Sequence, residues 1–109
     1  MVQEEFVNTI LDILSPISNI TTAKSQGFVG LYKDNVIFGR IIEQSVYLLS
    51  NGKKFIEVET ELITRLLRPK DQLNQYDLDT FLFEVTKAWW LAKGRTITIS
   101  NIKEILTKI

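Results

Sequence analysis

The sequence contains no cysteine and no histidine. Without cysteine there can be no disulfide, no thiolate nucleophile and no cysteine-based zinc site. Without histidine the chain lacks the most common general base of enzymes and the most common ligand of transition metals. Catalysis would have to rely on carboxylates, lysines and tyrosines, and no spacing among these suggests a catalytic site. We therefore expect no enzymatic activity, no bound metal and no cofactor.

The chain also lacks an excess of charge of either sign and a long apolar run. Thirteen basic residues balance thirteen acidic ones, and the isoelectric point is near 6.3. Duplex DNA binding depends on neutralising phosphates, for which a neutral domain is poorly suited. No run approaches the roughly 20 apolar residues that span a bilayer, and the acidic start does not resemble a signal peptide. These absences favour a cytoplasmic protein that makes no membrane contact.

The sequence has enough apolar residues for one domain. Its 109 residues are 45% hydrophobic, and no repeat, low-complexity tract or interdomain linker divides them. We therefore expect residues 1–109 to form a single domain with its own core. Apolar residues at three- and four-residue spacing predict a first helix over residues 4–14, which Ser15-Pro16 ends.

The middle of the chain has the pattern of β-strands. Residues 28–33 and 36–42 flank Asp34-Asn35, a pair that tolerates positive φ and suits a tight hairpin turn. We predict that Leu31, Val36 or Phe38 belongs to a buried sheet face. Another strand is expected over residues 45–49, before a loop at 50–53. The pattern predicts an antiparallel meander of three or four strands.

The segment from Phe55 to Arg68 has a mixed pattern. Alternation of apolar and acidic residues around Val58 indicates a strand, whereas the spacing of the leucines that follow is helical. We predict two strands with a bend near Thr60, and Pro69 ends the segment.

A second helix is predicted over residues 78–93, with Asp77 as its N-cap and Gly94 just after its end. Residues 95–99 are extended in character, and a short last helix is expected over residues 100–109. Helix, antiparallel strands and helix together predict a two-layer α+β fold. One face of the sheet would pack against the helices, and the other would be left for solvent or a partner.

Three short motifs have the form of possible functional sites. Gly27-Phe28-Val29-Gly30 has the G-x-x-G form of some nucleic-acid-binding loops, but glycine next to a bulge or in a crowded strand is favoured. The carboxylates of Glu57, Glu59 and Glu61 would share one side of a strand and can bind a hard cation, yet a solvated strand face is favoured. Lys24 and Ser25 are adjacent, so on a strand they point to opposite faces and cannot act as a pair.

Phe83 and Trp90 form the candidate interface. On the second helix both lie about 140° from the centre of the apolar sector that contains Trp89. A single two-layer packing leaves them unburied. Either a neighbouring strand or the C-terminal residues cover them, or the two side chains anchor a homodimer or a protein partner.

The central part of the sequence is similar to the N-terminal domain of the TfoX/Sxy competence regulators. Gly30, Leu31, Tyr32, Asp34 and Phe38 fit the Gly-Leu-Tyr-x-Asp-x-x-x-Phe hairpin of that family. Lys24 stands where the family has a basic residue. The strand at residues 46–48 matches the family's Leu-Tyr-Leu strand, and the segment at residues 66–73 resembles the stretch before the family's last helix. The resemblance covers residues 5–93, and the second, C-terminal domain of full-length regulators has no counterpart in the sequence.

The resemblance implies a two-layer fold similar to that of secretion chaperones. It also implies a bacterial regulator of DNA-uptake genes that assists a DNA-bound transcription factor through protein–protein contacts. An alternative that remains open is a stand-alone adaptor or chaperone-like dimer unrelated to competence.

The missing residue types lead to a direct prediction. The purified chain should retain no zinc and should bind duplex DNA only weakly and in a salt-sensitive manner. Metal analysis and DNA titration at physiological salt measure both. Sub-micromolar, sequence-specific binding by the isolated chain would contradict the prediction.

Overall fold

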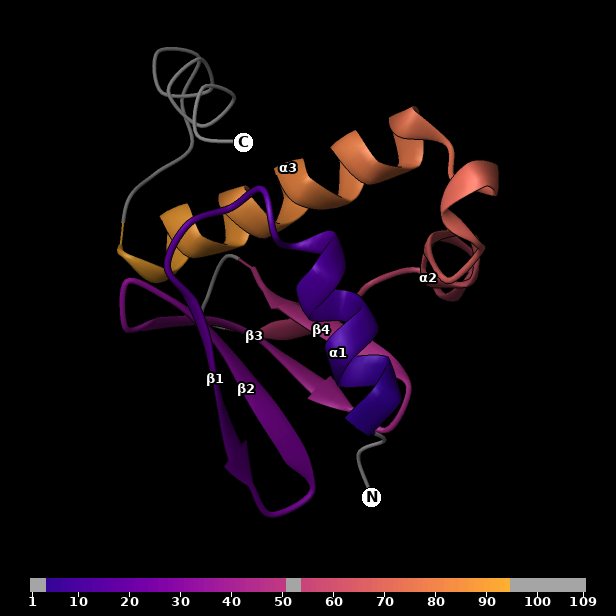
Figure 1. Cartoon of the computed structure of the whole chain (residues 1–109). Coiled ribbons are helices and arrows are strands. Elements are labelled where there is room, and N and C mark those ends of the chain that lie inside the picture. Colours follow the sequence, from indigo (N-terminus) through magenta and orange to yellow (C-terminus); the bar gives the residue numbers. More distant parts are fainter. Residues whose placement is uncertain (1–3, 51–53, 95–109) are drawn as a thin grey trace, which may run out of the picture.

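The computed structural model describes residues 4–50 and 54–94 (Figure 1). Its elements are α1 (Glu4–Ile13), β1 (Ile20–Ser25), β2 (Phe28–Lys33), β3 (Val36–Ile42), β4 (Ser45–Leu49), β5 (Phe55–Glu57), α2 (Thr60–Leu66), a 3₁₀ turn (Lys70–Gln72) and α3 (Gln75–Ala92). The strands form one antiparallel sheet in the order β1-β2-β3-β4-β5. This arrangement confirms the predicted α+β fold. No described helix is long and apolar enough to cross a membrane.

The hairpin of β2 and β3 has the predicted two-residue turn. Asp34 and Asn35 have φ values of 50° and 66°, the left-handed conformation that both residue types tolerate. The side-chain amide of Asn19 donates a hydrogen bond of 2.7 Å to the carboxylate of Asp34. The turn is therefore connected to the segment that leads from α1 to β1.

A β-bulge sets which side chains of β3 reach the core. Leu31 pairs with Gly39 and Tyr32 pairs with Ile37, so Phe38 is an extra residue between these pairs. Phe38 is fully buried, as is Leu31, whereas Val36 packs partly buried against the core. The prediction of a buried face at these residues is confirmed.

The helices pack on one face of the sheet, called here the inner face. Its buried residues share one cluster with the apolar side chains of α1, α2 and α3. The strand residues in this cluster are Val29, Leu31, Phe38, Ile41, Val46 and Leu48. The long helix α3 crosses the sheet and contacts β3 and β4 (Figure 1).

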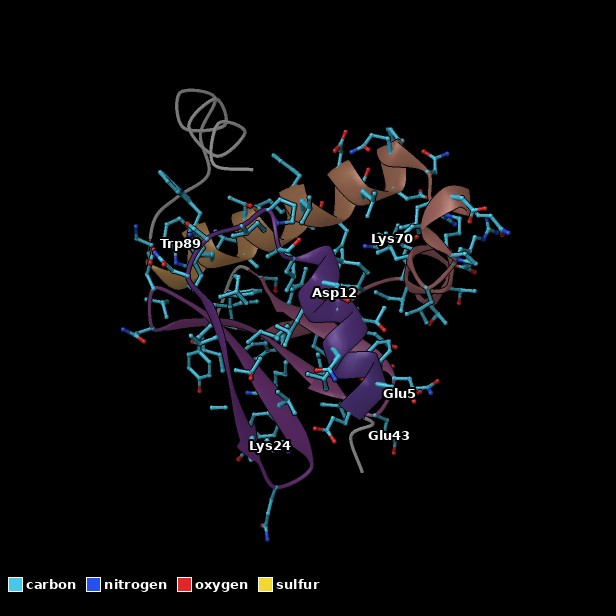
Figure 2. All side chains as sticks on the ribbon, in the orientation of Figure 1. Glu5, Asp12, Lys24, Glu43, Lys70 and Trp89 are labelled. Atoms are coloured by element: carbon cyan, nitrogen blue, oxygen red, sulfur yellow. The ribbon has the colours of Figure 1, made fainter. Side chains whose placement is uncertain are left out.

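A polar corner joins the hairpin, the α1–β1 connection and the C-terminal half of α3. The indole N–H of Trp89 donates a hydrogen bond of 3.1 Å to the backbone carbonyl of Lys33. The ammonium of Lys33, although the residue is buried, donates to the carbonyl of Ser18 at 2.9 Å and lies 4.8 Å from the Trp89 ring centroid. Lys93 lies 4.2 Å from the centroid of the same ring. Figure 2 labels Trp89 near the C-terminal end of α3.

The start of the long helix is corrected by the structure. α3 begins at Gln75, and its N-cap is Asn74, whose side chain accepts a hydrogen bond of 2.7 Å from the backbone N–H of Tyr76. Asp77 is therefore not the N-cap. Its carboxylate instead accepts a hydrogen bond of 3.0 Å from Arg65 of α2, and this bond raises the pKa of Arg65. At the other end Gly94 has φ 79°, which agrees with its predicted position just past the helix.

The segment after Phe55 contains one strand and not two. β5 ends at Glu57, and α2 follows from Thr60, so the predicted second strand is wrong. Helical spacing places Leu62, Ile63 and Leu66 together in the core, and burial of these three side chains favours the helix. Strand β1 was not predicted, because most of its side chains are exposed and give no apolar alternation. The predicted elements at 95–109 lie outside the described residues.

Replacement of Phe38 by Ala should lower the free energy of unfolding by about 3–5 kcal/mol, because it empties a fully buried site. Urea unfolding measures this change. Ile56→Ala is the control, since Ile56 is 55% exposed and its loss should cost about 0.5 kcal/mol or less. Equal effects of the two substitutions would contradict the bulged register.

Replacement of Trp89 by Phe should cost about 1–3 kcal/mol, because the buried carbonyl of Lys33 loses its donor. Thermal and urea unfolding report the loss. The matched control is Tyr76→Phe, which also removes one aromatic donor but at a side chain that is 76% exposed. If Trp89→Phe were as stable as the wild type, the polar corner would not hold the hairpin to α3.

Candidate protein-interaction surface

The face of the sheet opposite the helices is called here the outer face. Strand registers place on it the side chains that alternate with the buried ones. One row across the sheet runs from Gly30 through Arg40 and Tyr47 to Glu57. The other members are Phe28, Tyr32, Ile37, Ile42, Ser45 and Phe55. Apart from Gly30, each of these residues is half-buried or exposed, so the described helices do not cover the face.

Arg40 lies at the centre of the outer face between two aromatic rings. Its guanidinium carbon is 3.9 Å from the ring centroid of Phe55 and 5.0 Å from that of Phe28. These rings come from β5 and β2, so the arginine bridges the strands on either side of β3 and β4. Stacking of this kind holds the planar guanidinium by cation–π attraction.

The charge of Arg40 has no counter-ion among the described residues. The ion pairs there involve Lys33, Arg65 and Lys87, and none includes Arg40. Its Nε is buried and has no hydrogen-bond partner in the described part of the chain. A partly buried guanidinium with unused donors is a strong site for an external acceptor, because a carboxylate satisfies its charge and its hydrogen bonds together.

Gly30 allows an aromatic ring to lie flat on this face. A Cβ at Gly30 would be 2.9 Å from Cε1 of Tyr32, closer than real contacts allow. Any larger residue would therefore displace the Tyr32 ring. This agrees with the prediction that glycine in the G-x-x-G motif serves a crowded strand, while Gly27 has φ 81° in the turn before it.

The composition of the outer face is that of a protein interface. Phe, Tyr and Arg are enriched at the centres of such interfaces, where they supply rigid contact area and directed hydrogen bonds. A sheet face that only contacts water normally carries polar alternation instead. Phe28, Tyr47 and Phe55 do not fit a solvated face.

The predicted candidate residues Phe83 and Trp90 lie elsewhere. Trp90 is only 2% exposed and belongs to the core, and Phe83 is partly buried against it. Both side chains therefore pack against the core, which agrees with the predicted alternative in which the chain itself covers them. Leu14 and Ile17 of the α1–β1 connection belong to the same core cluster as Trp90, and Lys33 holds this connection near Trp89 through Ser18.

The acidic residues Glu57, Glu59 and Glu61 do not share a strand face. Glu57 ends β5, Glu59 precedes α2 and Glu61 lies in its first turn. Among the described residues no group of three potential carboxylate ligands gathers into a metal site. Lys24 and Ser25 pair with Val29 and Phe28, on opposite faces of the sheet, as predicted.

Two open grooves lie beside the sheet. The larger, of about 660 Å³, is lined by β4, β5, α2 and α3, including Ile56, Leu62 and Leu91. The smaller, of about 430 Å³, lies between α1 and the β1–β2 hairpin and includes Val7 and Lys24.

The outer face was missed for a physical reason. Aromatic residues in a strand are typical of a core, so Phe28 and Tyr47 gave no signal of a surface. The bulge at Phe38 also interrupts strict alternation in β3, which hides that Arg40 and Ile37 share a face. The sequence feature that indicates this face is Arg40, a charged residue within an otherwise apolar strand.

Comparisons of the chain with family models, with curated proteins and with solved structures find no match. The similarity to the TfoX/Sxy domain and to secretion chaperones therefore stays a prediction from the sequence. The surface is a sheet face that no described helix covers, with aromatic residues around one arginine that has no counter-ion among the described residues.

Proposed function

We propose that the chain is a non-enzymatic bacterial regulatory domain that acts by protein–protein contacts through the outer face. The observation that carries the proposal is Arg40, which is stacked among half-buried aromatic residues and has no counter-ion in the part of the chain that the structure describes. Such a surface offers large rigid contact area and one directional charge, the combination found at interface centres.

The biological process is proposed from the sequence resemblance. Residues Gly30, Leu31, Tyr32, Asp34 and Phe38, which match the TfoX/Sxy hairpin, form β2, β3 and their turn. We propose that the domain regulates competence and DNA-transformation genes in the cytoplasm, in contact with a transcription factor. A neutral charge suits this role, because a coactivator that contacts protein does not need to neutralise phosphates.

Tyr47 at the centre of the outer face provides the test. In the bacterium that encodes the chain, Tyr47→Asp should reduce expression of DNA-uptake genes to the level of a gene deletion, because a carboxylate at an interface centre is costly to desolvate. Transcript levels and transformation frequency are the measurements.

Tyr76→Asp is the matched control, since this tyrosine is 76% exposed on α3 and away from the sheet face. The control should keep wild-type expression, and both variants should keep wild-type protein levels. Unchanged expression with Tyr47→Asp would refute the proposed role of the face. Unchanged expression in the deletion itself would refute the competence assignment.

A further inference from the structure

We infer that the outer face binds the outer face of a second copy of the chain, with Arg40 of each copy paired to Glu57 of the other. This inference rests on the proposal that the face is a protein-binding surface, and it names the partner. The starting point is the row of Arg40, Tyr47 and Glu57 on three neighbouring strands. A positive and a negative side chain stand on either side of one tyrosine.

The two charges of the row do not reach each other within one chain. Arg40 and Glu57 are separated by two strand spacings, which is about 10 Å. Among the described residues neither of them forms an ion pair. The arginine lies on the rings of Phe28 and Phe55, and Glu57 is exposed at the edge strand. Each charge is thus available to a partner.

A two-fold axis that runs along the strands above Tyr47 would satisfy both charges. Rotation about this axis places β3 of one copy over β5 of the other, so Arg40 faces Glu57 twice. Tyr47 meets its own copy at the axis. Face-to-face sheets pack about 10 Å apart, a gap that arginine and glutamate side chains bridge. The interface is self-complementary, as a two-fold dimer requires.

The same geometry excludes a different axis. A two-fold axis across the strands at this row would place Arg40 against Arg40 and Glu57 against Glu57. Both contacts are repulsive. The charges of the row therefore specify the orientation of the second copy as well as its identity.

A charge-exchange experiment tests the inference. Arg40→Glu places two like-charge contacts in the dimer, as does Glu57→Arg, so each should raise the dissociation constant of its own dimer at least about tenfold. Mixed in equal amounts, the two variants should form a heterodimer, because one chain is negative at both positions and the other is positive at both. Sedimentation velocity of each chain and of the mixture measures association.

Two matched controls carry the same charge changes away from the outer face. Lys24→Glu lies on the inner side of β1 and Asp12→Arg lies on α1, and both positions are labelled in Figure 2. Both controls should dimerise as the wild type does. Thermal melts verify that every variant is folded, and the heterodimer provides a second check, because a misfolded chain would not associate.

Three results would overturn the inference: a wild-type chain that stays monomeric at its highest soluble concentration, single variants that dimerise normally, or a mixture without a heterodimer. A monomeric wild type whose Tyr47→Asp variant still loses gene expression would show that the outer face binds a different protein. In that case the proposed function stands and the second copy is rejected. A monomeric wild type whose Tyr47→Asp variant keeps wild-type gene expression would reject both the second copy and the proposed role of the face.

Discussion

The fold depends on one buried contact, between Lys33 and Trp89. The tryptophan donates a hydrogen bond to the lysine backbone, and the lysine side chain lies over the tryptophan ring and binds the α1–β1 connection at Ser18. Residues far apart in the sequence are thereby fixed at one corner. A buried ammonium is costly unless its donors are satisfied and its charge is balanced. Here a carbonyl, an aromatic face and the nearby carboxylate of Asp34 share that task.

This corner determines which residues of β2 face the helices, and the bulge in β3 then determines which of its residues lie on the outer face. Once Leu31 and Lys33 face the helices, alternation turns Tyr32 outward. The extra residue Phe38 keeps β3 in the core over one more position and returns Arg40 to the outer side. The aromatic outer face therefore follows from the contacts that hold the hairpin against α3. A change of register by one residue would turn Arg40 into the core.

Sequence reasoning succeeded where a local pattern and the tertiary environment agree. Local conformational preferences account for the Asp34-Asn35 turn, for the end of α1 before Pro16 and for Gly94 after α3. It fails where tertiary packing decides. The residues of α2 begin with strand-like alternation, yet a helix buries Leu62, Ile63 and Leu66, and Trp90 lies outside the apolar sector of α3 but belongs to the core. The candidate surface was missed for the same reason. An outward aromatic cannot be distinguished from a core one until the register is known.

The charge pattern explains how an apolar face can remain specific. A surface of Phe28, Tyr47 and Phe55 alone would attract many partners, because hydrophobic contact has little directional preference. Arg40 changes this, since any partner that covers it without a carboxylate leaves a buried charge without a counter-ion, which is costly. The arginine thus contributes mainly by rejecting unsuitable partners. In the proposed dimer, Glu57 on the same row of the second copy supplies this carboxylate, so a second copy meets the requirement that Arg40 sets.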